Sequence, residues 1–430
     1  MFNMALIGMG LANYRCFVER QDIELRPITV VLGRNNSGKS ALVRTPLVLS
    51  TGIRTDSPSP LDLDLLGEDV VDSFTDLLYG GRPHGSLQLD ARVANPESTE
   101  LAMSATVQNI DEYRQQVVSE LTISSEGRSF CLRWQPDGNL SDLRYVVESD
   151  GLTERDVRVT FEGLLPSAIV GDPANGERDR ALLSMASAIR AGFGEVRYLG
   201  PFRDRPARYY RSPARMPNNV GHSGEHTAGV LSLDLTRNQG KLLRQINREL
   251  KDSLPGWDVD ILARGGVFNI VLRSQMDNTL AINLADTGTG VAQALPIFVQ
   301  RALDVLYPSA DPVLEIVEQP ELHLHPAAHA ALADLYLRAS SVSRQRFLIE
   351  THSETILLRL RRRIAEGTAD PANIAVYFVE SNGGASSTRR INISQDGGLD
   401  YWPDGVFSED YQETKALASA QISRLKSNAR

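Results

Sequence analysis

The stretch that decides the fold is Gly33-Arg34-Asn35-Asn36-Ser37-Gly38-Lys39-Ser40, a complete G-x-x-x-x-G-K-[ST] loop. In such a loop the glycines allow tight turns, the N–H groups cradle phosphates, the lysine reaches the β/γ oxygens and the serine hydroxyl binds Mg²⁺. The apolar run 28–32 predicts a buried strand before the loop, and residues 40–43 predict a helix start after it. The competing interpretation is a chance Gly-rich turn. We therefore predict an ATP site whose binding residues are Gly33, Asn35, Asn36, Ser37, Gly38, Lys39, Ser40 and Ala41.

Composition and charge narrow the class of protein. The chain has 430 residues, 42% of them hydrophobic and 23% charged, which is typical of a soluble globular protein with one large domain or two packed lobes. The net charge of −9 argues against a surface that is basic throughout, although a local basic groove is compatible with it. Two cysteines, Cys16 and Cys131, form no disulfide framework, and the start of the chain lacks a membrane span or a signal. We expect a cytoplasmic protein without membrane contact.

The order of patterns along the chain predicts an α/β fold with an insertion. Residues 86–158 alternate apolar and polar side chains, which is typical of antiparallel strands with one buried face. Residues 70–79 suggest a short helix and residues 177–192 a longer one. We predict a P-loop core from residues 1–50 and 255–430, with a small strand-rich extension from about 370. Residues 51–254 are expected to form a β-rich and helical insertion.

A second segment supplies acids that a nucleotide site needs. The apolar strand 313–317 ends at Glu318, which is followed by Gln319, Pro320 and Glu321. A carboxylate at the carboxyl end of a parallel strand beside the P-loop strand can reach a Mg²⁺ ion bound to the phosphates. Solvated acids at a strand–loop junction are the competing interpretation. With the P-loop present, we predict that Ser40 and Glu318 hold Mg²⁺.

Taken together, the motifs resemble the ABC-type ATPases of the RecF, SMC and OLD group, often described as AAA-family ATPases. Four segments match in order: residues 13–17 (NYRCF), the P-loop, residues 318–326 (EQPELHLHP) and residues 350–353 (ETHS). Residues 286–293 (DTGTGVAQ) resemble the signature motif of that group. Residues 198–206 and 402–407 resemble segments of bacterial proteins that carry a C-terminal domain of unknown function.

This resemblance implies a two-lobed ABC-type head and roles for individual residues. Thr289 and Gly290 of the signature would contact the nucleotide of a partner subunit, and His352 would sense the γ-phosphate. One P-loop and one signature in each chain imply a head-to-tail homodimer with two shared ATP sites. The implied function is ATP-driven dimerisation that gates an operon-encoded effector protein or a nucleic-acid transaction, in anti-phage defence or DNA repair. After His352 we find no D-x-D motif and too little chain for the nuclease domain of OLD proteins.

The chain departs from this group at one position. Where the group places a glutamate that polarises water, this sequence has Gln319, whose amide can orient water but cannot accept its proton. We therefore expect either that hydrolysis is slow or that Glu321 acts as a replacement base, within a catalytic set of Glu318, Gln319, Glu321 and His352. The alternative is a non-hydrolysing, ATP-bound sensor or scaffold that holds or inhibits a partner. A P-loop kinase is disfavoured because it has no use for the signature or His352.

Four other patterns allow two interpretations each. His323, His325 and His329 could bind zinc, but loop contacts are favoured, and residues 221–225 resemble a helix cap more than a nucleophile elbow. The run 359–363 (RLRRR) is best explained as a solvated helix face. Four arginines near two tyrosines could bind nucleic acid or form internal salt bridges, and the sequence leaves both open: Arg203, Arg205, Arg208 and Arg211.

Overall fold

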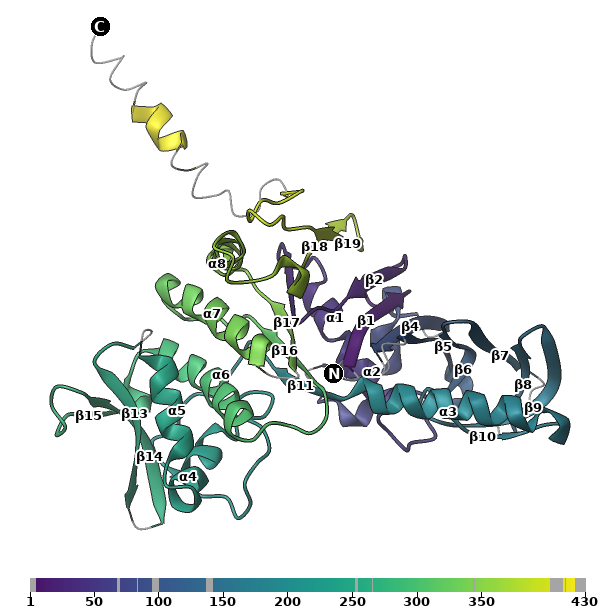
Figure 1. Cartoon of the computed structure of the whole chain (residues 1–430), viewed down its shortest axis with the longest axis horizontal. Helices are drawn as coiled ribbons and strands as arrows, with labels where there is room; N and C mark the ends of the chain where they lie inside the picture. Colours follow the sequence, from purple (N-terminus) through teal and green to yellow (C-terminus); the bar gives the residue numbers. More distant parts are fainter. Residues whose placement is uncertain are drawn as a thin grey trace, which may run out of the picture.

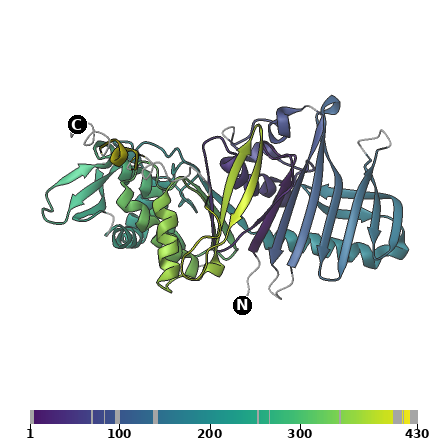
Figure 2. The ribbon, with the colours of Figure 1, turned by 90° about the horizontal axis from the view of Figure 1, so that it is seen from above.

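The chain folds into an elongated molecule with a sheet at each end and a third between them (Figures 1 and 2). The computed structural model describes residues 5–67, 70–82, 84–94, 100–136, 142–251, 254–264, 266–342, 345–402, 413 and 415–421. Within these residues no helix is long and apolar enough to cross a membrane.

The central sheet contains the strand that leads into the P-loop. Its six strands run in the order β11-β16-β17-β3-β18-β19, of which the first five are parallel and β19 is antiparallel. Helices cover both faces, so every residue of the inner strands β3 and β16 is buried, and these two strands are mainly apolar in sequence. The bounds are β11 Glu195–Leu199, β16 Val313–Glu318, β17 Gln345–Glu350, β3 Ile28–Gly33, β18 Ile374–Asn382 and β19 Ala385–Ile391.

The central sheet separates two hydrophobic cores. Val31 and Ile316 belong to the core shared with α1 (Lys39–Val43), α2 (Thr45–Ile53) and the nine-stranded sheet described below. Their neighbours Val30 and Val317 belong to the opposite core, which contains buried residues of the larger helices. These helices are α4 Thr227–Arg237, α5 Lys241–Leu250, α6 Thr289–Leu306, α7 Pro326–Val342 and α8 Glu354–Ala365. Successive side chains along a strand point to opposite faces of the sheet. Each strand therefore contributes to both cores, and the central sheet joins the two lobes.

A nine-stranded antiparallel sheet forms one end of the molecule, with α3 (Gly176–Phe193) lying along it (Figure 2). Its strand order is β10-β9-β8-β7-β6-β5-β4-β1-β2. This confirms the antiparallel β-rich insertion that the alternating pattern predicts. The bounds are β1 Ala5–Ala12, β2 Gln21–Glu24, β4 Gly85–Ala94, β5 Glu100–Ile110, β6 Gln115–Ser125, β7 Arg128–Gln135, β8 Arg144–Ser149, β9 Leu152–Glu162 and β10 Leu165–Val170.

The other end of the molecule carries a small sheet packed beside α4 and α5 (Figure 1). It consists of β12 Tyr210–Arg211, β13 Trp257–Arg264, β14 Val267–Ser274 and β15 Ala281–Asn283. Single 3₁₀ turns connect other elements: Leu63–Leu65, Phe74–Leu77, Tyr79–Gly81, Asp111–Tyr113, Pro173–Asn175, Leu284–Asp286 and Pro371–Asn373. The short helix expected at 70–79 is thus two 3₁₀ turns, interrupted at Leu78 by extended backbone.

Strand pairing divides the chain differently from the expected boundaries. β1 and β2 join the nine-stranded sheet, although they lie within the segment assigned to the core. β11 lies within the expected insertion but pairs with β16, and β18 of the expected C-terminal extension pairs with β3. These partners are far apart in sequence. Local patterns show that a segment is a strand, but they carry no information about its neighbour in the sheet.

Candidate nucleotide-binding and hydrolysis site

The P-loop has the strand–loop–helix geometry that its sequence predicts. It follows β3 and enters α1, and three of its residues have positive φ angles: 155° at Gly33, 59° at Asn36 and 100° at Gly38. A Cβ atom at Gly38 would lie 2.4 Å from Cys16 Sγ, and one at Gly33 would lie 2.6 Å from the Val379 carbonyl oxygen. Both glycines are therefore required by the close approach of neighbouring chain as well as by conformation.

The segment 13–17 packs against this loop. The segment is a turn after β1, with φ angles of 51° at Asn13 and 50° at Arg15. Tyr14 and Phe17 are fully buried. The Cys16 carbonyl accepts a 2.8 Å hydrogen bond from the Ser386 N–H. The turn is therefore a buried support for Gly38, and its aromatic residues are core residues.

Lys39 already points along the P-loop. Its side chain is buried, and Nζ donates a 2.7 Å hydrogen bond to the Arg34 carbonyl. Burial lowers the pKa of Lys39, and the nearby Glu350 carboxylate partly offsets this. A triphosphate in the loop would supply the negative charge that a buried ammonium group lacks.

Sequence reasoning missed Glu350 as a site residue. Ser40 Oγ donates a 3.1 Å hydrogen bond to Glu350 Oε1, and the Oε2 atom is buried without a hydrogen-bond partner among the described residues. Burial and the neighbouring Glu318 raise the pKa of Glu350 to about 7. The register of β16 and β17 places Glu318 directly beside Glu350. The sequence feature that could have identified Glu350 is that two strands, which are adjacent and parallel in the sheet, both end in glutamate.

Glu318, the expected Mg²⁺ ligand, holds an arginine in this structure. Arg44 Nε lies 2.6 Å from Glu318 Oε1, and Arg44 Nη2 donates to Oε2 at 2.8 Å. The guanidinium also lies 5.6 Å from the centre of the Tyr198 ring. Burial opposes the charge on Arg44, but the hydrogen-bonded Glu318 outweighs it and raises the pKa of the guanidinium. Arg44 is therefore a cation at the position where the sequence predicts a metal.

The residues at this edge of the sheet fit a magnesium ion. Mg²⁺ prefers hard oxygen ligands, and the Ser40 hydroxyl with the carboxylates of Glu318 and Glu350 provides them. The buried, unpartnered Oε2 of Glu350 is the atom that a cation would satisfy. Ser40 is linked by a hydrogen bond to Glu350, so three candidate oxygen donors lie at the ends of α1, β16 and β17.

Gln319 begins a strained turn after β16. Its φ angle is 45°, and its N–H donates a 2.8 Å hydrogen bond to the Glu350 carbonyl. Glu321 is buried in the same turn, and its Oε1 accepts a 2.7 Å hydrogen bond from the His352 N–H. Glu321 is thus engaged with the backbone of the expected γ-phosphate sensor, an arrangement that suits positioning His352 better than taking a proton from water.

His352 lies between the P-loop and this turn. The residue as a whole is exposed, but part of the ring is buried. This partial burial and the positive charge of Lys39 lower the pKa of His352, so the imidazole is neutral at pH 7. Thr351 N–H donates to the Val31 carbonyl at 3.2 Å, while Ser353 caps α8 by accepting from the Ile356 N–H at 3.2 Å. Both neighbours are fixed, which holds the histidine backbone at the sheet edge.

The signature-like segment starts α6 in the other lobe. Gly288 is the residue before the helix, and no side chain caps the first-turn N–H groups. A Cβ atom at Gly290 would lie 2.8 Å from the His323 carbonyl oxygen, and Thr289 is exposed. No hydrogen bond connects Thr289 or Gly290 to the P-loop of the same chain in the described structure. The helix start is therefore open to a ligand from outside the chain.

The arginine-rich segment is only partly exposed. Arg203 is 5% exposed and donates to the carbonyls of Glu318 and Gln319, so of the two interpretations left open an internal role fits this residue and contact with nucleic acid does not. Arg208 forms an ion pair with Asp286 of the signature segment at 2.6 Å. Arg205 and Arg211 are exposed. Arg203 is buried because the loop after β11 passes under the Gln319 turn. The local sequence does not indicate this contact.

The histidine cluster does not form a metal site in the described part of the chain, where no three His, Cys, Asp or Glu side chains gather around one point. His329 instead contacts Ser353 Oγ at 2.9 Å and the Leu324 carbonyl at 3.3 Å. These contacts lie within the chain, so the favoured interpretation, loop contacts across the dimer, stays a prediction. Both ring nitrogens of His329 are engaged, and none is left for zinc.

Two further expectations can be compared with the structure. Glu225 accepts hydrogen bonds from the N–H groups of His222 and Ser223, which makes residues 221–225 a closed turn and not a nucleophile elbow. In the run 359–363, Arg363 forms a bidentate pair with Asp334. The basic residues are therefore partly neutralised within the chain.

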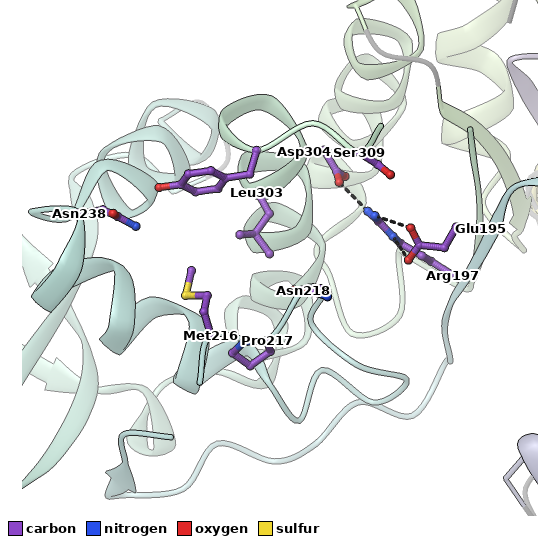
Figure 3. Close-up of a pocket in the computed structure, with 10 residues that line it drawn as sticks. Glu195, Arg197, Met216, Pro217, Asn218, Asn238, Leu303, Asp304 and Ser309 are labelled. Atoms are coloured by element: carbon purple, nitrogen blue, oxygen red, sulfur yellow. Dashed lines mark hydrogen bonds and ion pairs between the residues drawn. The ribbon is translucent and has the colours of Figure 1, made fainter. Parts of the chain in front are cut away.

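A cavity of about 490 Å³ lies apart from the P-loop (Figure 3). Arg197 reaches from β11 toward Glu195 and Asp304, with N–O distances of 2.7 to 2.9 Å (Figure 3). The rest of the lining comes from the loop before α4, the end of α4, and the last turn of α6 with the loop after it: Met216, Pro217, Asn218, Asn238, Leu303, Tyr307 and Ser309. Since its one guanidinium is already paired with two carboxylates, the cavity offers no free positive charge for a nucleotide.

Comparison with protein-family models supports the assignment of an ATPase domain to this chain. Residues 234–357 match the AAA ATPase domain, and residues 370–417 match a protein family of unknown function, DUF3696. No curated protein matches the chain. The chain thus combines an AAA ATPase domain with a C-terminal domain of unknown function, as the motifs predict. Of the segment 402–407 that carries part of this resemblance, only Trp402 lies within the described residues.

Solved structures of SMC heads are similar at low identity. The SMC head domain from Thermotoga maritima has a TM-score of 0.43 at 13% identity, covering 91% of this chain and 100% of that one. An SMC head bound to the C-winged helix domain of ScpA has a TM-score of 0.48 at 12% identity, with 91% and 98% covered. The Pyrococcus furiosus head with an extended coiled coil, bound to the C-terminal domain of ScpA, has 0.46 at 12%, with 90% and 96% covered. The fold assignment here rests on the P-loop and the strand order.

Proposed function

We propose that this protein is an ATPase that binds ATP and Mg²⁺ at the P-loop, hydrolyses ATP slowly and forms an ATP-dependent homodimer. The observation that carries the proposal is the meeting of Lys39, Ser40, Glu318 and Glu350 at the carboxyl edge of the central sheet. Strand ends of open α/β sheets are where ligands bind. An ammonium group, a hydroxyl group and two carboxylates there are the set needed for a triphosphate and its metal.

In this proposal each residue has a defined task. The P-loop N–H groups and Lys39 bind the phosphates, and the Ser40, Glu318 and Glu350 oxygens hold Mg²⁺, which would neutralise charge on the β- and γ-phosphates when bound. Arg44 must release Glu318 for this to happen. A neutral His352 can donate a hydrogen bond to a γ-phosphate oxygen, and Glu321 keeps its backbone in place.

Dimerisation would complete the site. The N-terminus of α6, with Thr289 and Gly290, has no capping side chain in the described structure, and the N–H groups of a first helical turn attract a phosphate. Since these residues make no hydrogen bond to the P-loop of their own chain in the described structure, a second copy is the simplest source of the phosphate. Gel filtration with light scattering tests this: ATP should double the mass, and ADP should not.

Lys39→Ala is the variant that tests nucleotide binding itself. We expect at least 100-fold weaker binding of a fluorescent ATP analogue and no ATP-dependent dimer, because the buried ammonium group is lost. Lys241→Ala removes an exposed lysine at the start of α5 and should change neither. Equal binding by the two variants would contradict the proposal.

Slow hydrolysis follows from Gln319, which cannot take a proton from water. Gln319→Glu should raise kcat about tenfold. The variant would count against this reading if it hydrolysed ATP no faster than the parent. Robust parental turnover that survives Glu321→Ala but needs Gln319 would also contradict slow hydrolysis.

The downstream target is proposed to be an effector protein or nucleic acid, in anti-phage defence or DNA repair. Exposed Arg205 and Arg211 are available for phosphate contacts, while Arg208 is paired with Asp286. A sensor or scaffold that holds ATP without turnover is favoured by Gln319 and by the Arg44–Glu318 pair. Steady-state hydrolysis by the parent, abolished in Glu318→Gln, separates the enzyme from the scaffold.

A further inference from the structure

Arg203 is a buried cation that contacts no substrate-binding residue of the P-loop. It lies in the loop that follows β11 and is 5% exposed. Its Nη2 donates to the Glu318 carbonyl at 3.0 Å and to the Gln319 carbonyl at 3.4 Å. One guanidinium therefore holds two successive carbonyls at the point where β16 ends and the Gln319 turn begins.

The backbone of Arg203 is in turn attached to the signature helix. Gln293 Nε2 donates a 3.2 Å hydrogen bond to the Arg203 carbonyl. Gln293 lies one helical turn after Thr289 on α6 and is 8% exposed. A displacement of the start of α6 is therefore passed to residue 203 through a buried hydrogen bond.

The other side of this connection is the Mg²⁺-binding edge. Gln319 has a φ angle of 45°, which costs free energy for a residue with a Cβ, and its N–H is tied to the Glu350 carbonyl at 2.8 Å. Glu350 carries the carboxylate that accepts from Ser40. Contacts from α6 through Arg203 and Gln319 to Glu350 thus form one continuous chain of hydrogen bonds.

The position of Arg203 is costly. Its Nε and Nη1 atoms are buried with no hydrogen-bond partner among the described residues, and Glu321 Oε2 is in the same condition nearby. Burial lowers the pKa of Arg203, and Tyr336 and Glu321 only partly compensate. Burying a cation with unpaired donors costs free energy. This favours a functional role over a purely stabilising one.

We propose that Arg203 is a positioning residue that couples the signature helix to the Gln319 turn, so that engagement of Thr289 and Gly290 by a partner's nucleotide sets the water-orienting amide. This inference rests on the proposed ATPase function and adds a regulatory connection to it. ATP binding to the P-loop of a single chain does not need the connection, whereas turnover in the dimer does.

The test compares Arg203→Ala, Arg203→Lys and Gln293→Ala with the parent. In Arg203→Ala we expect at least a tenfold loss of kcat, KM for ATP within twofold of the parent, and unchanged affinity of the nucleotide analogue. Arg203→Lys retains a charged donor and should recover part of kcat. Gln293→Ala should lower kcat although the Arg203 guanidinium is unchanged. The double variant of Arg203→Ala and Gln293→Ala should be no slower than Arg203→Ala alone, because the two residues belong to the same connection.

Arg215→Ala is the matched control, because Arg215 is an exposed arginine in the segment between β12 and α4. Variants at Arg203 and Gln293 that behave like Arg215→Ala in an active parent would overturn the coupling and leave the ATPase proposal standing. A loss of nucleotide affinity in parallel with kcat would assign Arg203 a merely structural role and would also overturn it. A parent that neither binds nor hydrolyses ATP would instead sink the proposed function, and the coupling with it.

Discussion

Two glutamates on one strand have opposite surroundings. Glu315 and Glu318 both lie on β16, three residues apart, and each is 2% exposed. Glu315 lies within the strand, under α6, whereas Glu318 is its last residue, at the edge where the P-loop strand also ends. Burial alone therefore does not distinguish a structural from a functional carboxylate; its position along the strand does.

The partners of the two glutamates differ accordingly. Glu315 accepts a hydrogen bond from Arg301 of α6, which also donates to Gln345 of β17 at 2.8 Å and lies 4.7 Å from the Phe347 ring centre. This cluster fastens α6 to the central sheet. Glu318 is paired with Arg44, and it lies beside a second acid, Glu350, whose Oε2 has no partner in the described structure. At the strand end two acids face one arginine, which leaves room for a cation, whereas Glu315 and Asp304 are balanced by Arg301 and Arg197.

The largest expected effect is on turnover, from Glu318→Gln. We expect kcat to fall about 1000-fold, because an amide is a weak Mg²⁺ ligand and stabilisation by the metal amounts to several kcal/mol. The amide oxygen can still accept from Arg44, so the fold should persist. The measurement is ATP hydrolysis across a Mg²⁺ titration. A loss of kcat just as large in folded Glu315→Gln would erase the distinction between the two glutamates.

A smaller effect, on stability, is expected from Glu315→Gln. Removing one of the two buried carboxylates that pair with Arg301 (those of Glu315 and Asp304) should lower the free energy of unfolding by about 3 kcal/mol, measured by urea denaturation without nucleotide. Affinity for the ATP analogue should not change. Glu177→Gln, at an exposed position on α3, should stay within about 0.5 kcal/mol of the parent. If Glu315→Gln were as stable as this control, the cluster would not contribute to holding α6 against the central sheet.

The smallest expected effect is a pH dependence caused by Glu350. Its pKa is raised from 4.5 to about 7, so between these values the unfolded chain loses a proton that the folded chain keeps. Stability of the protein free of nucleotide and Mg²⁺ should therefore fall by about 2 kcal/mol as pH rises from 4.5 to 7. Glu350→Gln cannot ionise and should lack this decrease. Identical pH profiles for the parent and the variant would show that Glu350 is not held protonated.

Much of the site could be predicted because its signals are local. The spacing of Gly33, Gly38 and Lys39 specifies a loop conformation that few residue types allow, and the apolar run before it specifies a buried strand. The end of β16 at Glu318 and the start of α6 at Thr289 were likewise visible in consecutive residues. Short-range periodicity and turn chemistry determine such features.

What escaped prediction depends on pairing between distant segments. Glu350 became a site residue because β17 lies beside β16 in parallel register, and Arg203 became buried because β11 joins the same sheet. Residues 13–17 became a buried turn because they meet the P-loop and Ser386. None of these neighbours can be inferred from periodicity.

By itself, the sequence determined that a phosphate-binding loop joins a buried strand to a helix, in an α/β chain with an antiparallel insertion. Only the tertiary structure decided which acids face Ser40, which cation holds Glu318 and how the signature helix connects to Gln319. The physical reason is that backbone conformation follows from neighbouring residues. Electrostatic and hydrogen-bonding partners, in contrast, follow from strand register, which brings together groups that are far apart in the chain.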